Sequence, residues 1–178
     1  MVKLSGNIFN RMRGSLNTTF HPNEVHEGML TTRGLRLIKP SIDSIPEVKW
    51  AFLTDKRFCN EKIYKEFERF MPPGFELVSP PAEQDAFTYA LNLNGQMNRM
   101  KFLFELNKNY LRDRKPESGS IIAYYLEDSL EIDPIHAGIY AGNERVNSRF
   151  SLGYPVVQHP INDIPYSEFH YECYKKRS

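Results

Sequence analysis

The hydrophobic residues of this chain change their spacing near residue 119, and this change limits the fold more than any other feature. Before it, apolar residues recur every three or four positions, as on one face of an α-helix. After it, apolar and polar residues alternate in short segments between turn residues, which is typical of β-strands. Helices followed by strands joined by short connections define the α+β class. We therefore expect N-terminal helices packed on an antiparallel sheet of about five strands.

The expected strands lie close together in the second part of the chain. They are residues 121–127, 135–142, 144–150, 154–160 and 170–176. Two segments before the change in spacing are also extended: residues 33–38 could form a short strand, and residues 75–79 form a strand or an extended lead-in. The short connections favour neighbouring antiparallel strands.

The expected helices come before these five strands. They are residues 46–54, a second helix that Asn60 could cap and Pro72-Pro73-Gly74 ends, a third that opens near residue 86, and residues 97–112. In the last helix, the expected core positions are Met100, Leu103, Phe104 and Leu111. We assign residues 76–178 to the core of the domain and residues 1–75 to a helical extension of the same domain.

Length and charge restrict the class of protein. A chain of 178 residues is enough for one ordinary domain. A net charge of +1 gives no support for a nucleic-acid or membrane partner. No apolar run approaches the ~20 residues that cross a bilayer, and the N-terminus lacks the apolar centre of a secretory signal. We expect a cytoplasmic protein, or one that is delivered without a signal peptide as a secreted effector or a phage-encoded enzyme.

The two cysteines, Cys59 and Cys173, have no metal-type spacing and form no disulfide framework. His21, His26 and His170 also lack the spacing of metal ligands, so we expect surface positions for them and neither a metal nor another cofactor.

Two histidines are the candidate catalytic groups. His136 opens a strand beside the small residues Ala137 and Gly138, which let another group approach its imidazole. His159 ends the strand after next, and in a meander two such strands can lie side by side. One imidazole could then act as a base while the other orients it. The best place for a nucleophile is the start of a helix facing the sheet, and position 86, at such a start, holds alanine.

Four segments carry a resemblance to a known family. They are Asp-x-Phe-x-Tyr-Ala-Leu at 85–91, Gly-Ser-Ile-Ile-Ala-Tyr-Tyr at 119–125, His-Ala-Gly-Ile-Tyr-x-Gly-Asn-x-Arg-Val-x-Ser at 136–148, and Pro-Val-Val-x-His-Pro at 155–160. Their order resembles the papain-like cysteine hydrolases, in particular the NlpC-type endopeptidases and amidases. The resemblance covers about residues 80–170, and the His-Ala-Gly-Ile-Tyr-x-Gly block is its most specific part.

The resemblance implies a role for three positions. Ala86 stands where the family has its nucleophilic cysteine, His136 matches the base, and His159 matches the residue that orients the base, with Asn162 or Asp163 as alternatives. Ser120 replaces an aspartate that is usual in the family. The N–H of residue 86 would help to hold the oxyanion. Cys59, beside Lys56 and Arg57, precedes the helix that the fold would use, so we expect an idle or structural thiol there.

The alanine at position 86 has two explanations, an engineered inactive variant or a natural pseudoenzyme. We favour the first because both histidines and the strand pattern are retained. The expected activity is that of a cysteine peptidase or amidase acting on a protein or peptide substrate. The alternatives are a glutamine deamidase or transglutaminase-like effector of the same fold, and a pseudoenzyme that binds a peptide or a partner. The oligomeric state stays open.

Overall fold

The computed structural model describes residues 39–40, 43–44, 46–53, 59–60, 64–127, 133–164 and 168–177. The chain divides into two compact units, Met1–Phe52 and Leu53–Ser178. Helix α4 (Pro46–Leu53) confirms the helix expected at 46–54. The strand expected at 33–38 lies outside the described residues. The second unit contains the candidate site.

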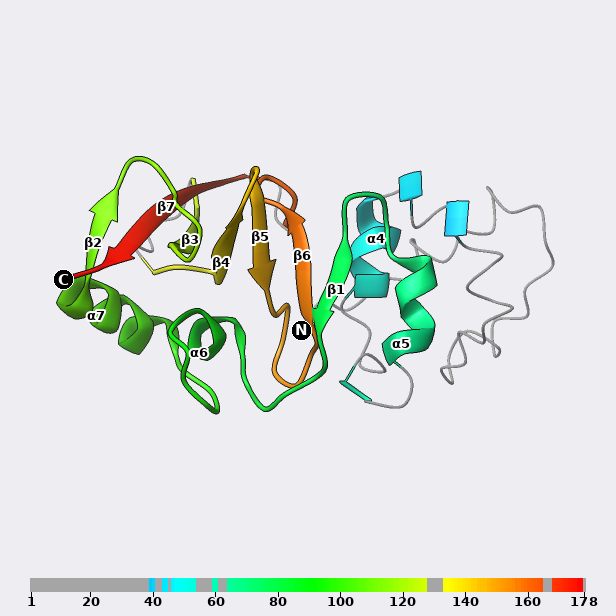
Figure 1. Cartoon of the computed structure of the whole chain (residues 1–178), viewed down its shortest axis with the longest axis horizontal. Coiled ribbons are helices and arrows are strands. Elements are labelled where there is room, and N and C mark those ends of the chain that lie inside the picture. Colours follow the sequence, from blue (N-terminus) through cyan, green and yellow to red (C-terminus); the bar gives the residue numbers. More distant parts are fainter. Residues whose placement is uncertain are drawn as a thin grey trace. The chain divides into compact units, whose positions relative to one another are not determined.

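A seven-stranded antiparallel sheet forms the centre of this unit (Figure 1). Its strands are β1 (Glu76–Ser79), β2 (Tyr110–Asp113), β3 (Ile121–Leu126), β4 (His136–Gly142), β5 (Arg145–Ser148), β6 (Val156–Pro160) and β7 (Phe169–Lys176). The α+β class is confirmed, whereas the expectation of about five strands is wrong. The two further strands lie at the two edges of the sheet. Strand β1 lies where a strand or an extended lead-in was expected at 75–79, whereas β2 was not expected.

The order of strands in the sheet is β1-β6-β5-β4-β3-β7-β2. Strands β3 to β6 form a meander, and β7 returns to pair with the other side of β3. Strand β5 therefore lies between β4 and β6. The expectation that the strands of His136 and His159 lie directly side by side is wrong, because each of them pairs with β5 instead.

Four short helical segments accompany the sheet. They are α5 (Tyr64–Phe67), the 3₁₀ turn η2 (Glu68–Phe70), α6 (Ala86–Ala90) and α7 (Arg99–Asn109). The backbone carbonyl of Asn60 accepts a hydrogen bond from the N–H of Tyr64, so the residue expected as a cap lies at the start of α5. Helix α7 begins after Asn98, whose side chain accepts a hydrogen bond from the N–H of Lys101.

Helix α7 ends three residues earlier than the spacing predicts. Tyr110 has an extended backbone, with φ −128° and ψ 160°, and opens β2. Pairing with β7 holds the strand, and Arg112 adds an ion pair with Glu172 of β7 at 2.7 Å. Tertiary pairing here overrides the helical pattern of the sequence.

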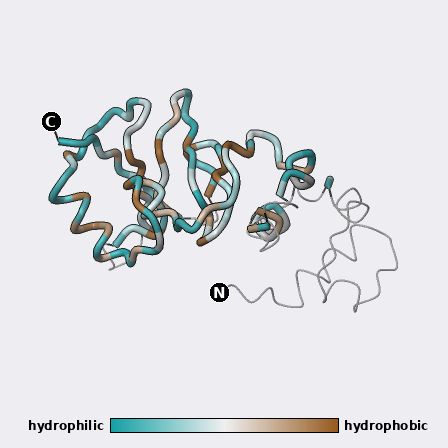
Figure 2. Tube along the Cα trace, turned by 60° about the horizontal axis from the view of Figure 1, so that its bottom comes forward, coloured by the Kyte–Doolittle hydropathy of each residue, from teal (hydrophilic) through white to brown (hydrophobic). Residues whose placement is uncertain are grey.

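Of the four core positions expected in this helix, Leu103 is half-buried and the other three are wrong. Met100 and Phe104 are each 62% exposed and Leu111 is 53% exposed, whereas Phe102 and Leu106 are fully buried. Figure 2 shows how brown and teal residues alternate along this part of the trace. Phe102 packs on Phe87 of the preceding helix, with ring centroids 4.7 Å apart, and this contact sets which side of α7 faces the sheet.

The sheet has a buried cluster on each face, which explains why β3 is apolar along its length. One cluster joins the helices to the sheet and contains Ala90, Phe102, Leu106, Ala123 and Ala137 among others. The second contains Ile122, Tyr124, Val146, Ile161 and Cys173 among others. Since neighbouring residues of a strand point to opposite faces, this division also fixes the faces of the candidate site residues.

Candidate functional site

A tight network of hydrogen bonds positions the start of α6. The Asp85 carboxylate accepts from the N–H of Thr88 at 2.8 Å, and the Thr88 hydroxyl accepts from the N–H of Asp85 at 3.0 Å. The second carboxylate oxygen of Asp85 accepts from the N–H of Met97 at 2.9 Å. This reciprocal capping box makes Ala86 the first residue of the helix. The sequence correctly predicts a helix that opens at this position.

Helix α6 packs against β4 and, less extensively, against β5. Ala90 belongs to the same buried cluster as Ala137, the residue that follows His136. Ala86 lies one helical turn before Ala90 and is also buried. Position 86 is therefore a small, buried residue at the start of a helix that packs on the strand of His136.

His136 is the first residue of β4 and is only 6% exposed. Its ring stacks on Phe150 with the centroids 5.5 Å apart, and it lies 5.7 Å from the ring of Tyr124 on β3. Its Nε2 atom is buried and makes no hydrogen bond to the described part of the chain. Burial, and to a smaller extent the nearby His159, lowers the pKa of His136 to about 3. The imidazole is therefore neutral at physiological pH and holds one unused nitrogen.

His159 lies near the end of β6 and is fully buried. Its Nδ1 lies 2.8 Å from the carbonyl oxygen of Pro160, and because a carbonyl only accepts, this nitrogen is the donor. Its Nε2 lies 2.8 Å from the hydroxyl of Ser148 on β5 and accepts from it when the ring is neutral. Burial lowers the pKa of His159 to about 4, and the Pro160 carbonyl and Asp163 oppose this shift.

The two histidines are near each other without a hydrogen bond between them. Phe150 lies 5.3 Å from the His159 ring as well as 5.5 Å from the His136 ring, all measured between centroids. Both ring nitrogens of His159 bond elsewhere, so they do not orient His136. Of the two alternatives, Asp163 lies near His159, and Asn162 is exposed.

The segment 149–153, which joins β5 to β6, contacts both His136 and the neighbourhood of position 86. Phe150 stacks on His136, while the N–H of Gly153 donates to the carbonyl of Gln84 at 3.4 Å. The guanidinium of Arg149 lies over the ring of Tyr89 on α6, 5.4 Å from its centroid. Segment 149–153 therefore contacts α6 and the residue before its N-cap on one side and His136 on the other.

The alternation along β4 restricts how residue 86 and His136 can meet. Ala137 faces the helices with Ala123, its partner on β3, whereas His136 is paired with Tyr124, which faces the other cluster. His136 and the helix α6 therefore lie on opposite faces of the sheet. Residue 86 and the imidazole can meet only beyond the first residue of β4, where Phe150 lies, and not across the middle of the strand.

Three residues of this neighbourhood were not singled out from the sequence: Ser148, Arg149 and Phe150. Ser148 could have been found by pairing the expected strands, because it lies on β5 opposite Gly138 of β4. Cys59 also borders the segment, since its sulfur lies 3.9 Å from the carbonyl oxygen of Leu152. Cys173 is buried on β7, as expected for a strand residue.

Searches for relatives add nothing to this geometry: no protein-family model, curated protein or solved structure matches the chain. Within the described residues, no group of three or more His, Cys, Asp or Glu side chains is arranged to hold a metal ion. In the same part of the chain, no helix has the length and apolar character needed to cross a membrane.

Proposed function

We propose that this protein has a papain-like fold and that its active form, with cysteine at position 86, is a thiol hydrolase that cleaves an amide bond. The observation that supports the proposal is the shared contact of two elements with segment 149–153. One is the start of α6, where a small buried residue occupies the first helical position. The other is His136, a buried neutral imidazole with an unused nitrogen.

The chemistry follows from these two groups. A cysteine at position 86 would transfer its proton to the neutral His136, and the thiolate would attack the amide carbonyl. The protonated His136 would then give the proton to the departing amine as the C–N bond breaks, leaving an acyl-enzyme. Water, deprotonated by His136, would release the acyl group as a carboxylic acid and restore the thiol. Amides in the first turn of a helix have no carbonyl partner within it, so the N–H of residue 86 suits the oxyanion.

Restoring the cysteine tests this proposal. We expect Ala86→Cys to react with iodoacetamide at pH 7 about tenfold faster than a cysteine placed elsewhere on α6, because an ion pair with protonated His136 would stabilise the thiolate. Ala90→Cys, one turn further along the same face, is the matched control, and the unsubstituted protein gives the background of Cys59 and Cys173. Adding His136→Gln to Ala86→Cys should remove the difference. Equal reactivity at positions 86 and 90, or reactivity that ignores His136, would contradict the proposal.

A second candidate function is that of a partner-binding pseudoenzyme with the same fold. It is favoured by the hydrogen bonds of His159, which go to Ser148 and Pro160 and leave Nε2 of His136 without an orienting group. This function predicts that the natural gene encodes alanine at position 86 and that Ala86→Cys is inert. A cysteine codon in the natural gene would exclude it.

A further inference from the structure

We propose that Arg149 binds a carboxylate group of the ligand that enters the candidate site. The inference rests on the proposed function in one respect, since it takes this ligand to be the peptide substrate. It adds a chemical class to that substrate: a peptide with a carboxylate close to the bond that position 86 would attack.

Arg149 is a buried cation. It follows β5 directly and is 4% exposed. Its Nη1 donates to the carbonyl oxygens of Tyr154 and of Pro80, the latter at 3.3 Å. Its guanidinium lies over the ring of Tyr89. These contacts fix the plane of the guanidinium, and none of them carries a full negative charge.

One edge of the same guanidinium is unused. Nε of Arg149 is buried and has no hydrogen-bond partner among the residues that the structure describes. Nη2 donates to no described residue either, since the bonds of this side chain all use Nη1. Nε and Nη2 point in parallel from one edge of the plane, which is the arrangement that binds the two oxygens of a carboxylate.

The charge of Arg149 is also unbalanced. No ion pair within the described residues involves this side chain, although buried charges are normally paired. Burial lowers the pKa of Arg149, and the group nevertheless stays protonated, as arginine does in proteins. An uncompensated buried cation is costly, and an incoming carboxylate would remove this cost.

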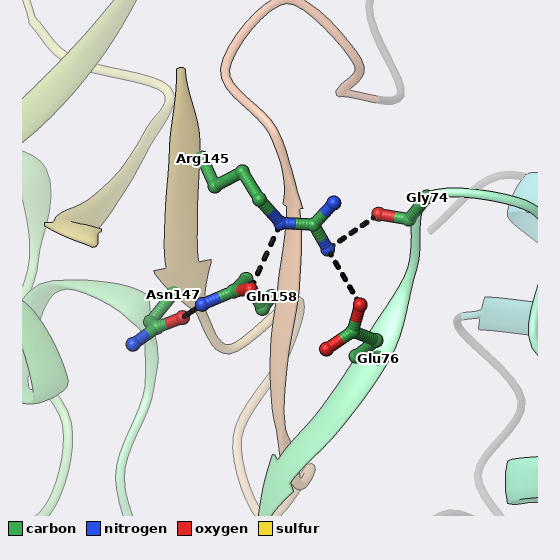
Figure 3. A network of polar contacts seen from close by, with 5 residues as sticks. All are labelled: Gly74, Glu76, Arg145, Asn147 and Gln158. Carbon is green, nitrogen blue, oxygen red and sulfur yellow. Dashed lines mark hydrogen bonds and ion pairs between the residues drawn. The ribbon is translucent and has the colours of Figure 1, made fainter. Parts of the chain in front are cut away.

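Arg145, four residues earlier, shows the contrast (Figure 3). Its Nε donates to Gln158 at 2.8 Å, and its Nη2 donates to the carbonyl of Gly74 at 2.8 Å and lies 3.5 Å from the Glu76 carboxylate. The edge that is unused in Arg149 is therefore occupied by protein groups in Arg145. Arg145 has a structural role in holding β1 to β5 and β6, whereas the buried Nε–Nη2 edge of Arg149 has no such protein partner.

The place of Arg149 links this edge to position 86. Pro80 precedes α6 and Tyr89 lies within it, so the guanidinium is held against the same short helix that Ala86 opens. A carboxylate on the Nε–Nη2 edge would lie beside this helix. The carboxylate could be the end of a peptide chain or an acidic side chain, and both present the same two oxygens.

The test measures ligand binding to the protein with Ala86, which lacks a nucleophile and cannot cleave the ligand. The Nε–Hε signal of Arg149 is followed by nitrogen-15 NMR and assigned by its loss in Arg149→Lys. Four probes are titrated: acetyl-Ala-Ala with a free C-terminus, the same peptide as its amide, acetyl-Glu-Ala-amide and acetyl-Gln-Ala-amide. We expect a saturable shift with at least one carboxylate probe and none with the matched amide. The free C-terminus and the glutamate probe distinguish the two sources of the carboxylate.

Two variants complete the experiment. Arg149→Lys keeps the positive charge and removes the two parallel N–H donors. The carboxylate probe that binds to the unsubstituted protein should therefore bind to this variant about tenfold more weakly. Arg145→Lys should leave its affinity unchanged. Equal responses to acid and amide, or no saturable shift with either carboxylate probe, would overturn the proposal without any variant. Because no cysteine is involved, this result is independent of the labelling at position 86.

Discussion

His136 stacks on Phe150, with ring centroids 5.5 Å apart and ring planes inclined by only 12°. The same phenyl ring lies 5.3 Å from the imidazole of His159. The Phe150 ring therefore lies beside both neutral imidazoles and helps to shield them from water. Burial lowers the pKa of both histidines, and this ring contributes to that burial, so its removal should raise both pKa values.

Replacing Phe150 with alanine should admit water to both imidazoles. Desolvation is the main cause of the low pKa of His136, about 3, so we expect this pKa to rise by about one unit or more. NMR titration of the imidazole signals measures it. Phe150→Leu keeps an apolar shield and should produce a smaller rise. Identical titrations in the alanine and leucine variants would show that the ring does not exclude water.

The same two histidines should make the protein sensitive to acid. Burial lowers their pKa values from 6.5 to about 3 for His136 and about 4 for His159, so the unfolded chain binds more protons at intermediate pH. Their contribution to the free energy of unfolding is complete above pH ~6.5 and falls below it, by about 2 kcal/mol for each histidine at pH 5.

Urea unfolding at pH 8 and pH 5 measures this loss. We expect the free energy of unfolding to differ by about 4 kcal/mol between the two pH values, and by about half of that in His136→Gln. Equal stability at pH 8 and pH 5 would mean that the imidazoles are hydrated in the folded protein.

Short apolar or alternating segments between turn residues predicted β3 to β7, and residues 75–79 were expected as a strand or a lead-in where β1 lies. The sequence missed the edge strand β2. Residues 110–113 continue a helical spacing, and only their pairing with β7 makes them a strand. The phase of α7 was ambiguous as well, because Met100 and Phe104 are spaced as Phe102 and Leu106 are. Contact with Phe87 and the sheet decides which pair is buried.

The candidate site also has parts that the sequence predicts and parts that it does not. The start of α6 could be predicted from Asp85 and the residues after it, because capping is local. The partners of His136 and His159 could not be predicted. They depend on the order of strands and on the register of β4 with β5, which shifts between Tyr140 and Gly142. Phe150 lies beyond the end of β5, where no strand pattern fixes its direction.

Asp85 should contribute more to stability than an ordinary helix cap. Asp85→Ala removes the bonds from the N–H and the hydroxyl of Thr88 and the bond from the N–H of Met97 together, and we expect a loss of about 2 kcal/mol in the free energy of unfolding. Asn98→Ala, which removes the single cap bond of α7, is the matched control at about 1 kcal/mol. Urea denaturation compares them. A cost no greater for Asp85 than for Asn98 would mean that the link to Met97 adds nothing.

Gly138 lies two residues after His136 on the same face of β4, where the strand meets β5. A Cβ at this position would lie 2.4 Å from Cγ1 of Val146 and 2.7 Å from the carbonyl oxygen of Asn147. A backbone oxygen cannot rotate away, so Gly138→Ala should force β4 and β5 apart and cost about 2–3 kcal/mol. Because Ser148 and Phe150 follow along β5, the stacking of His136 should be lost too, and its imidazole signals should shift.

Gly95→Ala separates this crowding from backbone strain. Gly95 has a positive φ of 82°, with nothing within 4 Å of an added Cβ, so its replacement should cost only about 1 kcal/mol and leave the His136 signals in place. Thermal or urea unfolding gives the two costs, and imidazole NMR gives the local effect. If Gly138→Ala were as mild as Gly95→Ala, β4 and β5 would have room to separate, and the close packing that holds His136 beside Phe150 would not be what fixes the site.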